Sequence, residues 1–193
     1  MSRLHYILCD TFNEIQQKLF KSITSGKRGE GRKPETFLTT EGGMKGPFNA
    51  WFFSPVFGEA VQRLGEVIRF ENSIPPQLRE LAILVVAAKW QAHYEWWAHE
   101  KIAIKEGLDQ KVITSLKMGV IPDFTQSSEA VVYNFARELI DQRRVSDQHY
   151  AKAVELLGEA GVVELVTLLG YYTLVSMSIN VFEVSVPETE LAS

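Results

Sequence analysis

Apolar residues recur every three or four positions along most of this 193-residue chain, a spacing typical of helices with one buried face. The segments 10–24, 54–70 and 127–139 show the pattern most clearly. Asp10 or Thr11 is placed to cap the first of them. No run of alternating apolar and polar residues is long enough to predict a strand. We therefore expect an all-α protein of about seven or eight helices.

The stretch 75–117 carries the strongest pattern and is expected to hold the core helices of the fold. Residues 76–90 are apolar nearly all round, which predicts a central, buried helix. A second helix is expected to follow a break at 90–93 and to end at Gly107, because glycine favours helix C-termini. Asp109 then caps a short third helix that runs to the end of the stretch.

Three further segments complete the predicted organisation. Glycines and a proline in residues 25–37 predict a flexible loop, and residues 184–193 lack a packing pattern and predict a loose tail. Residues 161–182 are long and apolar enough to cross a bilayer, but they include Glu164 and several other polar side chains. We expect a buried core helix here, no membrane partner, and a single domain over residues 1–193.

Composition narrows the possible classes of function. Hydrophobic residues make up 46% of the chain, which is ample for a packed core. The formal charge of −4 disfavours nucleic acid as a partner, because nucleic-acid binding needs a basic face. Cys9 is the single cysteine, so neither an internal disulfide nor a CxxC redox pair can form. A lone cysteine and an N-terminus without a signal-peptide pattern favour a cytoplasmic location.

Ionisable residues are concentrated in the otherwise apolar stretch 79–107. Glu95 and His99 are four residues apart on one predicted helix, so the carboxylate can orient the imidazole as a general base or proton shuttle. Glu80 lies nineteen residues before His99, on the preceding helix. Antiparallel packing of the two helices would bring Glu80 back beside them, where two carboxylates and one imidazole would share a proton. We predict Glu80, Glu95 and His99 as the catalytic residues.

Other interpretations of these residues remain open. Glu95 and His99 also fit an ordinary exposed helix pair. The HExxH zinc pattern fails after His99-Glu100, because the position of the second histidine is Ala103. Glu80, Glu95 and His99 together form a carboxylate–histidine set that could bind iron or zinc, although we predict no metal.

Aromatic side chains surround this candidate site. Trp90, Trp96 and Trp97 suit contacts in the core or between subunits, and the alternative is a wall that stacks on an unsaturated ligand. Of the three, we predict Trp96 to contact the substrate. His93 falls on a different helix face from His99 and is expected to make a polar contact at a helix start.

The run from Glu80 through YEWWAH at 94–99 resembles the carboxymuconolactone decarboxylase family. The resemblance is strongest over 75–117 and extends more loosely to 46–55 and 170–182. It implies the all-helical AhpD-like fold that this family shares with alkyl hydroperoxidases.

The hydroperoxidase branch of this fold carries a glutamate, a CxxC pair and a histidine. When that pattern is aligned at Glu80 and His99, the cysteine positions fall on Ala92 and Glu95. Thiol-based peroxide chemistry, which needs a thiolate and a resolving partner, is therefore disfavoured.

The resemblance implies an enzyme of the decarboxylase kind. We expect a cofactor-independent lyase or isomerase that acts on a small organic acid or lactone through a Glu/His proton relay. The family also implies a homo-oligomer, either a trimer or a hexamer. Two alternatives are kept: an AhpD-like peroxidase, and a non-catalytic oligomeric protein that binds a ligand.

Overall fold

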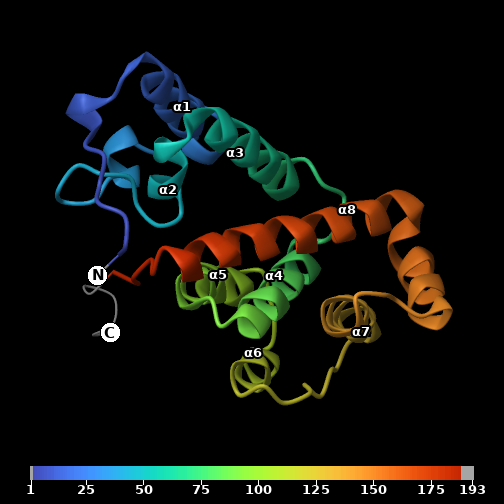
Figure 1. Cartoon of the computed structure of the whole chain (residues 1–193). Coiled ribbons are helices and arrows are strands. Elements are labelled where there is room, and N and C mark those ends of the chain that lie inside the picture. Colours follow the sequence, from blue (N-terminus) through green and yellow to red (C-terminus); the bar gives the residue numbers. More distant parts are fainter. Residues whose placement is uncertain (1, 188–193) are drawn as a thin grey trace. The chain divides into compact units, whose positions relative to one another are not determined.

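The computed structural model describes residues 2–187 and contains eight α-helices in that range, which confirms the all-α prediction (Figure 1). The helices are α1 (Glu14–Ser25), α2 (Phe48–Phe53), α3 (Pro55–Phe70), α4 (Pro76–Trp90), α5 (His93–Lys105), α6 (Gln110–Lys117), α7 (Ser127–Gln142) and α8 (Asp147–Val181). Three short 3₁₀ helices precede α2, at Cys9–Thr11, Lys27–Gly29 and Pro34–Phe37. Across the described residues, β structure is limited to two isolated bridges.

The chain forms two compact units. Among the described residues, one unit comprises 2–71 together with 178–187, and the other comprises Asn72–Met177. The single-domain organisation stays a prediction. Residues 188–193 of the expected tail lie outside the described residues, and residues 184–187 have no regular secondary structure.

The first unit is built by α1, α2 and α3 around a small aromatic core. Its buried members are Phe12, Leu19, Ile23, Phe37, Met44, Trp51 and Phe52. The cap of α1 is Asn13 rather than Asp10 or Thr11, which lie in a preceding 3₁₀ helix. The Asn13 side chain accepts hydrogen bonds from the backbone N–H groups of Ile15 and Gln16, and the Gln16 side chain accepts one from the Asn13 backbone. This reciprocal pairing satisfies donors that a helix start otherwise leaves free, so it fixes where α1 begins.

Residues 25–37 contain more regular structure than the sequence suggested, because two of the 3₁₀ helices lie there. The Glu66 carboxylate accepts a 2.6 Å hydrogen bond from the backbone N–H of Lys27. The guanidinium groups of Arg28 and Arg32 lie over the rings of Phe48 and Phe37, 5.4 and 5.7 Å from their centroids. These arginines therefore lie against aromatic side chains of their own unit.

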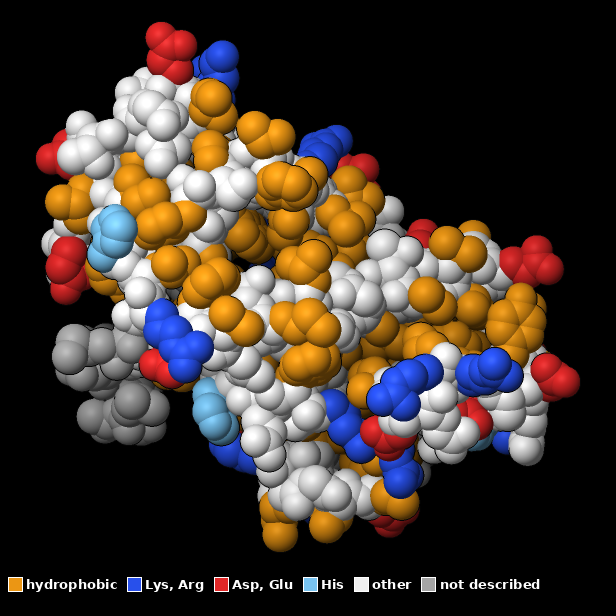
Figure 2. Space-filling view, in the orientation of Figure 1, with side chains coloured by type: hydrophobic (Ala, Val, Ile, Leu, Met, Phe, Trp, Pro, Cys, Tyr) orange, Lys and Arg blue, Asp and Glu red, His pale blue; other side chains and the backbone are white. Residues whose placement is uncertain are grey.

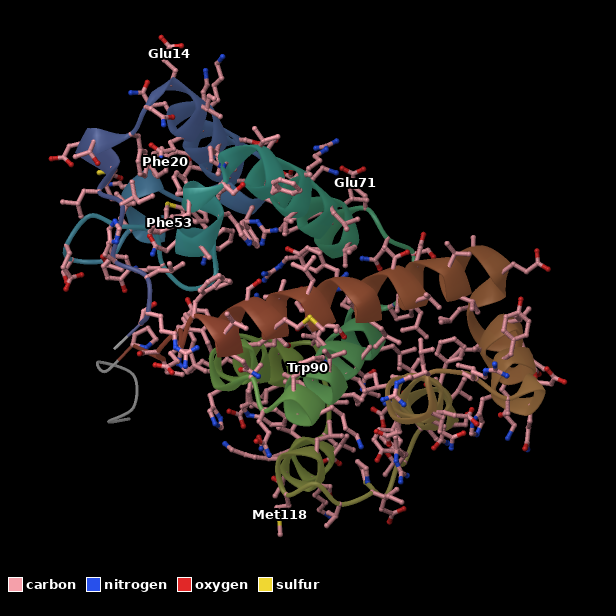
Figure 3. All side chains as sticks on the ribbon, in the orientation of Figure 1. Glu14, Phe20, Phe53, Glu71, Trp90 and Met118 are labelled. Carbon is pink, nitrogen blue, oxygen red and sulfur yellow. The ribbon has the colours of Figure 1, made fainter. Side chains whose placement is uncertain are left out.

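The second unit is organised around α4, which contacts α5, α6 and α7. Nine residues of α4 are buried, namely Leu78 and the unbroken run Glu80, Leu81, Ala82, Ile83, Leu84, Val85, Val86 and Ala87. The sequence predicted this central position from apolar residues all round the helix. Trp90 is the last residue of α4 (Figure 3), and α5 ends before Gly107, whose φ of +91° suits a glycine.

The long helix α8 bends at Gly158, whose φ of +71° is not helical. Beyond the bend one face is buried, as predicted, through residues that include Leu165, Leu168, Tyr172 and Val175. Glu164, the acidic residue within the apolar segment 161–182, accepts hydrogen bonds from the backbone N–H and the hydroxyl of Ser73.

The other face of α8 exposes apolar side chains (Figure 2), namely Val163, Val166, Leu174, Met177 and Val181. By length and composition alone, α8 could cross a membrane, and half of its most apolar window is buried inside the protein. A core helix of a soluble protein meets the same two criteria, so length and composition do not distinguish the two roles.

Two helix glycines, one in each unit, allow a tightly packed position in the first unit to be compared with an open one in the second. A Cβ at Gly58 of α3 would lie 2.7 Å from the backbone oxygen of Trp51, whereas one at Gly170 of α8 would meet nothing within 4 Å. We expect Gly58→Ala to destabilise the protein by about 1–3 kcal/mol through overpacking. Gly170→Ala should instead stabilise it by about 0.5–1 kcal/mol, because alanine favours helix. Urea unfolding followed by circular dichroism measures both, and equal stabilisation by the two variants would contradict the packing at Gly58.

Candidate proton-transfer site

A tight turn between α4 and α5 places the candidate residues. Gln91 adopts a left-handed conformation, with φ of 50°, and the backbone N–H of Ala92 donates to the carbonyl of Ala87 at 2.9 Å. These features end α4 and reverse the chain within two residues. Helix α5 then returns along α4, as the sequence predicted from the break at 90–93.

The return of α5 brings Glu80, Glu95 and His99 into direct contact. Nδ1 of His99 lies 2.6 Å from Oε2 of Glu80, and Nε2 lies 3.1 Å from Oε1 of Glu95. The side chains are 5%, 1% and 6% exposed for His99, Glu80 and Glu95 respectively. The structure therefore assembles the three residues that the sequence singled out, while their catalytic role stays a prediction.

Two further side chains complete the surroundings of this cluster. The ring of Tyr172, from α8, meets the His99 ring edge to face, with centroids 5.2 Å apart. Nε of Arg79 lies 3.7 Å from Oε1 of Glu80, close enough for an ion pair. One imidazolium and one guanidinium therefore face two carboxylates, and the cluster of Glu80, Glu95, His99 and Arg79 is formally neutral.

The electrostatics favour a protonated His99. Burial alone would lower the pKa of His99, but hydrogen bonds from the imidazolium to Glu80 and Glu95, and the charges of both carboxylates, outweigh it and raise the pKa to about 9. Both ring nitrogens then act as donors, one to each carboxylate.

This arrangement changes the role that the sequence suggested for His99. An imidazole whose two nitrogens are both engaged cannot accept a proton directly from a ligand. It can give a proton to either carboxylate, because each N–H lies within hydrogen-bond distance of one of them. Proton exchange with a ligand would then run through a carboxylate.

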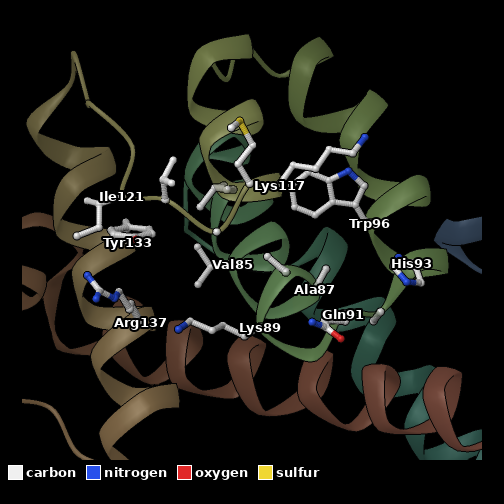
Figure 4. A pocket seen from close by; sticks show the side chains of 16 residues that line it. Val85, Ala87, Lys89, Gln91, His93, Trp96, Lys117, Ile121, Tyr133 and Arg137 are labelled. Carbon is white, nitrogen blue, oxygen red and sulfur yellow. The ribbon is translucent and has the colours of Figure 1, made fainter.

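A cavity of about 620 Å³ is lined by residues of α4, α5, α6 and α7 (Figure 4). Its lining includes Ala92, His93 and Trp96 of α5, but not Glu80, Glu95 or His99. Trp96 thus lines a cavity, while its contact with a substrate stays a prediction. His93 begins α5, as expected, and also borders this cavity.

Several cavity residues were not found by sequence reasoning. Lys89, Lys117, Tyr133 and Arg137 come from α4, α6 and α7, and they share no motif or spacing. Only the packing of these helices on one another brings them together.

Metal binding has no support from the geometry of the described residues. Among residues 2–187, no group of three or more histidine, cysteine, aspartate or glutamate side chains is arranged to hold a metal ion. In this arrangement both nitrogens of His99 are directed at carboxylates.

Residues 55–138 match the model of the carboxymuconolactone decarboxylase family. The matched segment contains the whole of α4 and α5. The fold is the all-helical AhpD-like fold expected for the family.

Solved structures show the same fold over nearly the whole chain. An uncharacterised peroxidase-related protein from Silicibacter sp. TM1040 superposes with a TM-score of 0.72 at 13% identity, over 97% of this chain and 93% of that one. The apo structure of the debrominase Bmp8 gives a TM-score of 0.70 at 12% identity, with the same coverages. At such identities the similarity shows the fold alone. A comparison with curated proteins found no match.

The two positions that align with the cysteines of the hydroperoxidase branch have different surroundings. Ala92 lines the cavity, whereas Glu95 contacts His99. The second thiol position has therefore become a carboxylate that faces the imidazole.

The pKa of His99 can be measured directly. We expect its imidazole to titrate near pH 9 in an NMR experiment on ring-labelled histidine. Glu95→Gln should lower that pKa, because it removes one of the two carboxylates that stabilise the imidazolium. A His99 that titrates at 6.5 or below in the unmodified protein would contradict the double hydrogen bond.

The same shift should make stability depend on pH. Because the pKa of His99 is 6.5 in its ordinary state and about 9 when folded, the folded protein alone holds the proton between these values. The free energy of unfolding should therefore be highest below pH 6.5 and should fall by about 3 kcal/mol as the pH rises to 9. Denaturant titrations at several pH values measure this loss. His149→Gln, at a partly exposed histidine–glutamate pair, should show the same fall of the unfolding free energy between pH 6.5 and 9 as the unmodified protein. If neither protein loses stability over this range, the raised pKa of His99 is refuted.

Proposed function

We propose that this protein is a cofactor-independent lyase or isomerase that acts on a small organic acid or lactone by proton transfer. The observation that carries the proposal is the buried imidazolium held between two carboxylates, Nδ1 to Glu80 and Nε2 to Glu95. The match of residues 55–138 to the carboxymuconolactone decarboxylase family supports the reaction class.

In the proposed reaction, Glu95 exchanges the proton with the substrate. Loss of CO₂ breaks a carbon–carbon bond and leaves its electron pair on the substrate as an enolate. The His99 imidazolium passes its Nε2 proton to the Glu95 carboxylate, and Glu95 delivers that proton to the carbon. The neutral imidazole keeps its Nδ1 proton, which it donates to Glu80, and Nε2 regains a proton from solvent through Glu95 after the product leaves. Arg79 beside Glu80 keeps the local charge balanced during these steps.

The position of Glu95 on α5 favours this role. Residues three apart are neighbours on a helix surface, so Glu95 lies next to Ala92, which borders the cavity. Trp96 and His99 are related in the same way. Glu95 is therefore a helix-surface neighbour of a cavity-lining position, and the proposed reaction requires that part of the cavity wall to move so that a ligand reaches Glu95.

Variants that keep side-chain size test the assigned roles. We expect Glu95→Gln and His99→Asn to slow product formation by about 10²- to 10⁴-fold on any lactone acid that the unmodified protein converts, because general acid–base steps contribute that much. Glu106→Gln, at the end of α5 and away from the cluster, should retain full activity. Unchanged turnover in both cluster variants would show that these residues are not catalytic.

A non-catalytic role is the second candidate, and the burial of the cluster favours it. No side chain of the three is more than 6% exposed, so the cluster could serve only to hold α4 and α5 together. In that case the protein would bind a small carboxylate, seen as a rise in melting temperature, without converting it. A thiol peroxidase has less support, since Cys9 is the single cysteine and lies in the first unit. Peroxide consumption that survives Cys9→Ser would rule out that thiol as its source.

We also propose that the protein forms homo-oligomers, as the family resemblance implies, and that it acts in the cytoplasm. Exposed apolar side chains on α3, Val56, Phe57 and Leu64, would suit contacts between subunits. Sedimentation of the purified protein without detergent tests both its solubility and its number of subunits.

A further inference from the structure

The part of α8 that follows the bend at Gly158 carries an exposed apolar face without charge. Four side chains of this face are 40–66% exposed, namely Val163, Val166, Leu174 and Met177. No charged residue occurs from Leu165 to Val181, and the carboxylate that precedes this run, Glu164, is hydrogen-bonded to Ser73. Contiguous apolar surface of this kind marks a contact with another molecule.

The exposed side chains are placed symmetrically about Gly170. Val166 and Leu174 lie four residues from it, one on each side, and Val163 and Met177 lie seven residues from it. At 3.6 residues per turn, all five positions fall within about 40° of one line along the helix. Gly170 is itself exposed, and a Cβ there would meet nothing within 4 Å, so the centre of this face is open.

Such a face is complementary to itself under two-fold symmetry. When a second copy of α8 crosses antiparallel at Gly170, Val166 of one copy meets Leu174 of the other. Val163 meets Met177 in the same way, and each contact occurs twice. The absence of a side chain at the crossing point lets the two backbones approach closely. The charges also match, because two uncharged faces meet and antiparallel helices place opposite ends of their dipoles together.

We propose that α8 forms a two-fold contact between two copies of this chain, centred on Gly170. The contact rests on the homo-oligomer proposed above, and it gives that assembly a surface and a symmetry. A two-fold axis is present in a dimer and in a hexamer made of two trimers, but not in a trimer alone. Of the two assemblies that the family resemblance implies, the contact therefore selects the hexamer, and it also allows a dimer.

The size of the contact determines its strength. From Val163 to Met177 the helix makes about four turns, or roughly 20 Å. The pairing ends beyond them, because the counterpart of Val181 across Gly170 is the charged Glu159. One pair of helices of this length buries less than the roughly 800 Å² per partner of a standard interface. By itself α8 should therefore hold two copies together weakly, with a Kd in the range of about 1–100 μM.

Sedimentation of the full-length protein without detergent, at concentrations up to about 0.5 mM, tests the contact. We expect an even number of subunits in the unmodified protein. Leu174→Glu should weaken the contact about 100-fold and halve that number, because two-fold symmetry buries the unpaired charge twice, at about tenfold each. Met118→Glu, at a 71% exposed apolar position outside α8, should leave the number unchanged. Circular dichroism confirms that each variant is folded.

Mixing experiments test the pairing of individual positions. Val166→Lys and Leu174→Glu should each separate the copies when studied alone, and an equimolar mixture should associate, because the introduced ammonium and carboxylate face each other across the contact. Val163→Lys mixed with Met177→Glu should behave in the same way. Val166→Lys mixed with Val163→Glu should stay apart, because these two positions do not face each other in the proposed pairing.

The proposal is overturned by an odd number of subunits, by a monomer at the highest concentration, or by mixtures that associate regardless of position. Flotation of the protein with phosphatidylcholine vesicles, lost in Leu174→Glu, would also overturn it, since lipid would then cover the face. An even-numbered assembly that Leu174→Glu leaves intact would remove the α8 contact but keep the homo-oligomer. None of these results bears on proton transfer, which depends on Glu80, Glu95 and His99.

Discussion

The contact of one imidazole with two carboxylates is the constraint on which the second unit depends. His99 and its two partners are almost fully buried, and each ring nitrogen is directed at a different carboxylate. Buried charges are tolerated only where they are paired and hydrogen-bonded. Removing any one of the three would leave an uncompensated charge in the core, so α4 and α5 are held at one spacing and one register.

The same requirement explains why α4 has its place in the fold. A helix that carries Glu80 among apolar residues cannot lie at the surface without exposing those residues, and it cannot be buried without a partner for the carboxylate. The left-handed turn at Gln91 resolves this conflict, because it returns α5 along α4 and delivers His99 to Glu80. Arg79 gives the same carboxylate a second cation.

Helix α5 contributes to two environments with different chemistry. At His99 and Glu95 the charged groups are paired and buried, which suits the storage and movement of a proton. At Ala92, His93 and Trp96 the same helix borders an open, largely apolar cavity. Neighbouring positions along α5 thus belong to an acid–base cluster and to the wall of a cavity.

The sequence by itself determined the helices, the break after Trp90 and the pairing of Glu95 with His99, because these depend on local spacing and on residues a few positions apart. It also indicated Glu80, since a short turn between two helices leaves little choice but an antiparallel return. The cap at Asn13 was missed, because a 3₁₀ helix at Cys9–Thr11 displaces the start of α1, and local pattern does not reveal it. The engagement of both nitrogens of His99, and the cavity that Lys89, Lys117 and Arg137 share with Trp96, could not be predicted from the sequence. Those features arise from the packing of α4 to α7 on one another, which no spacing along the chain encodes.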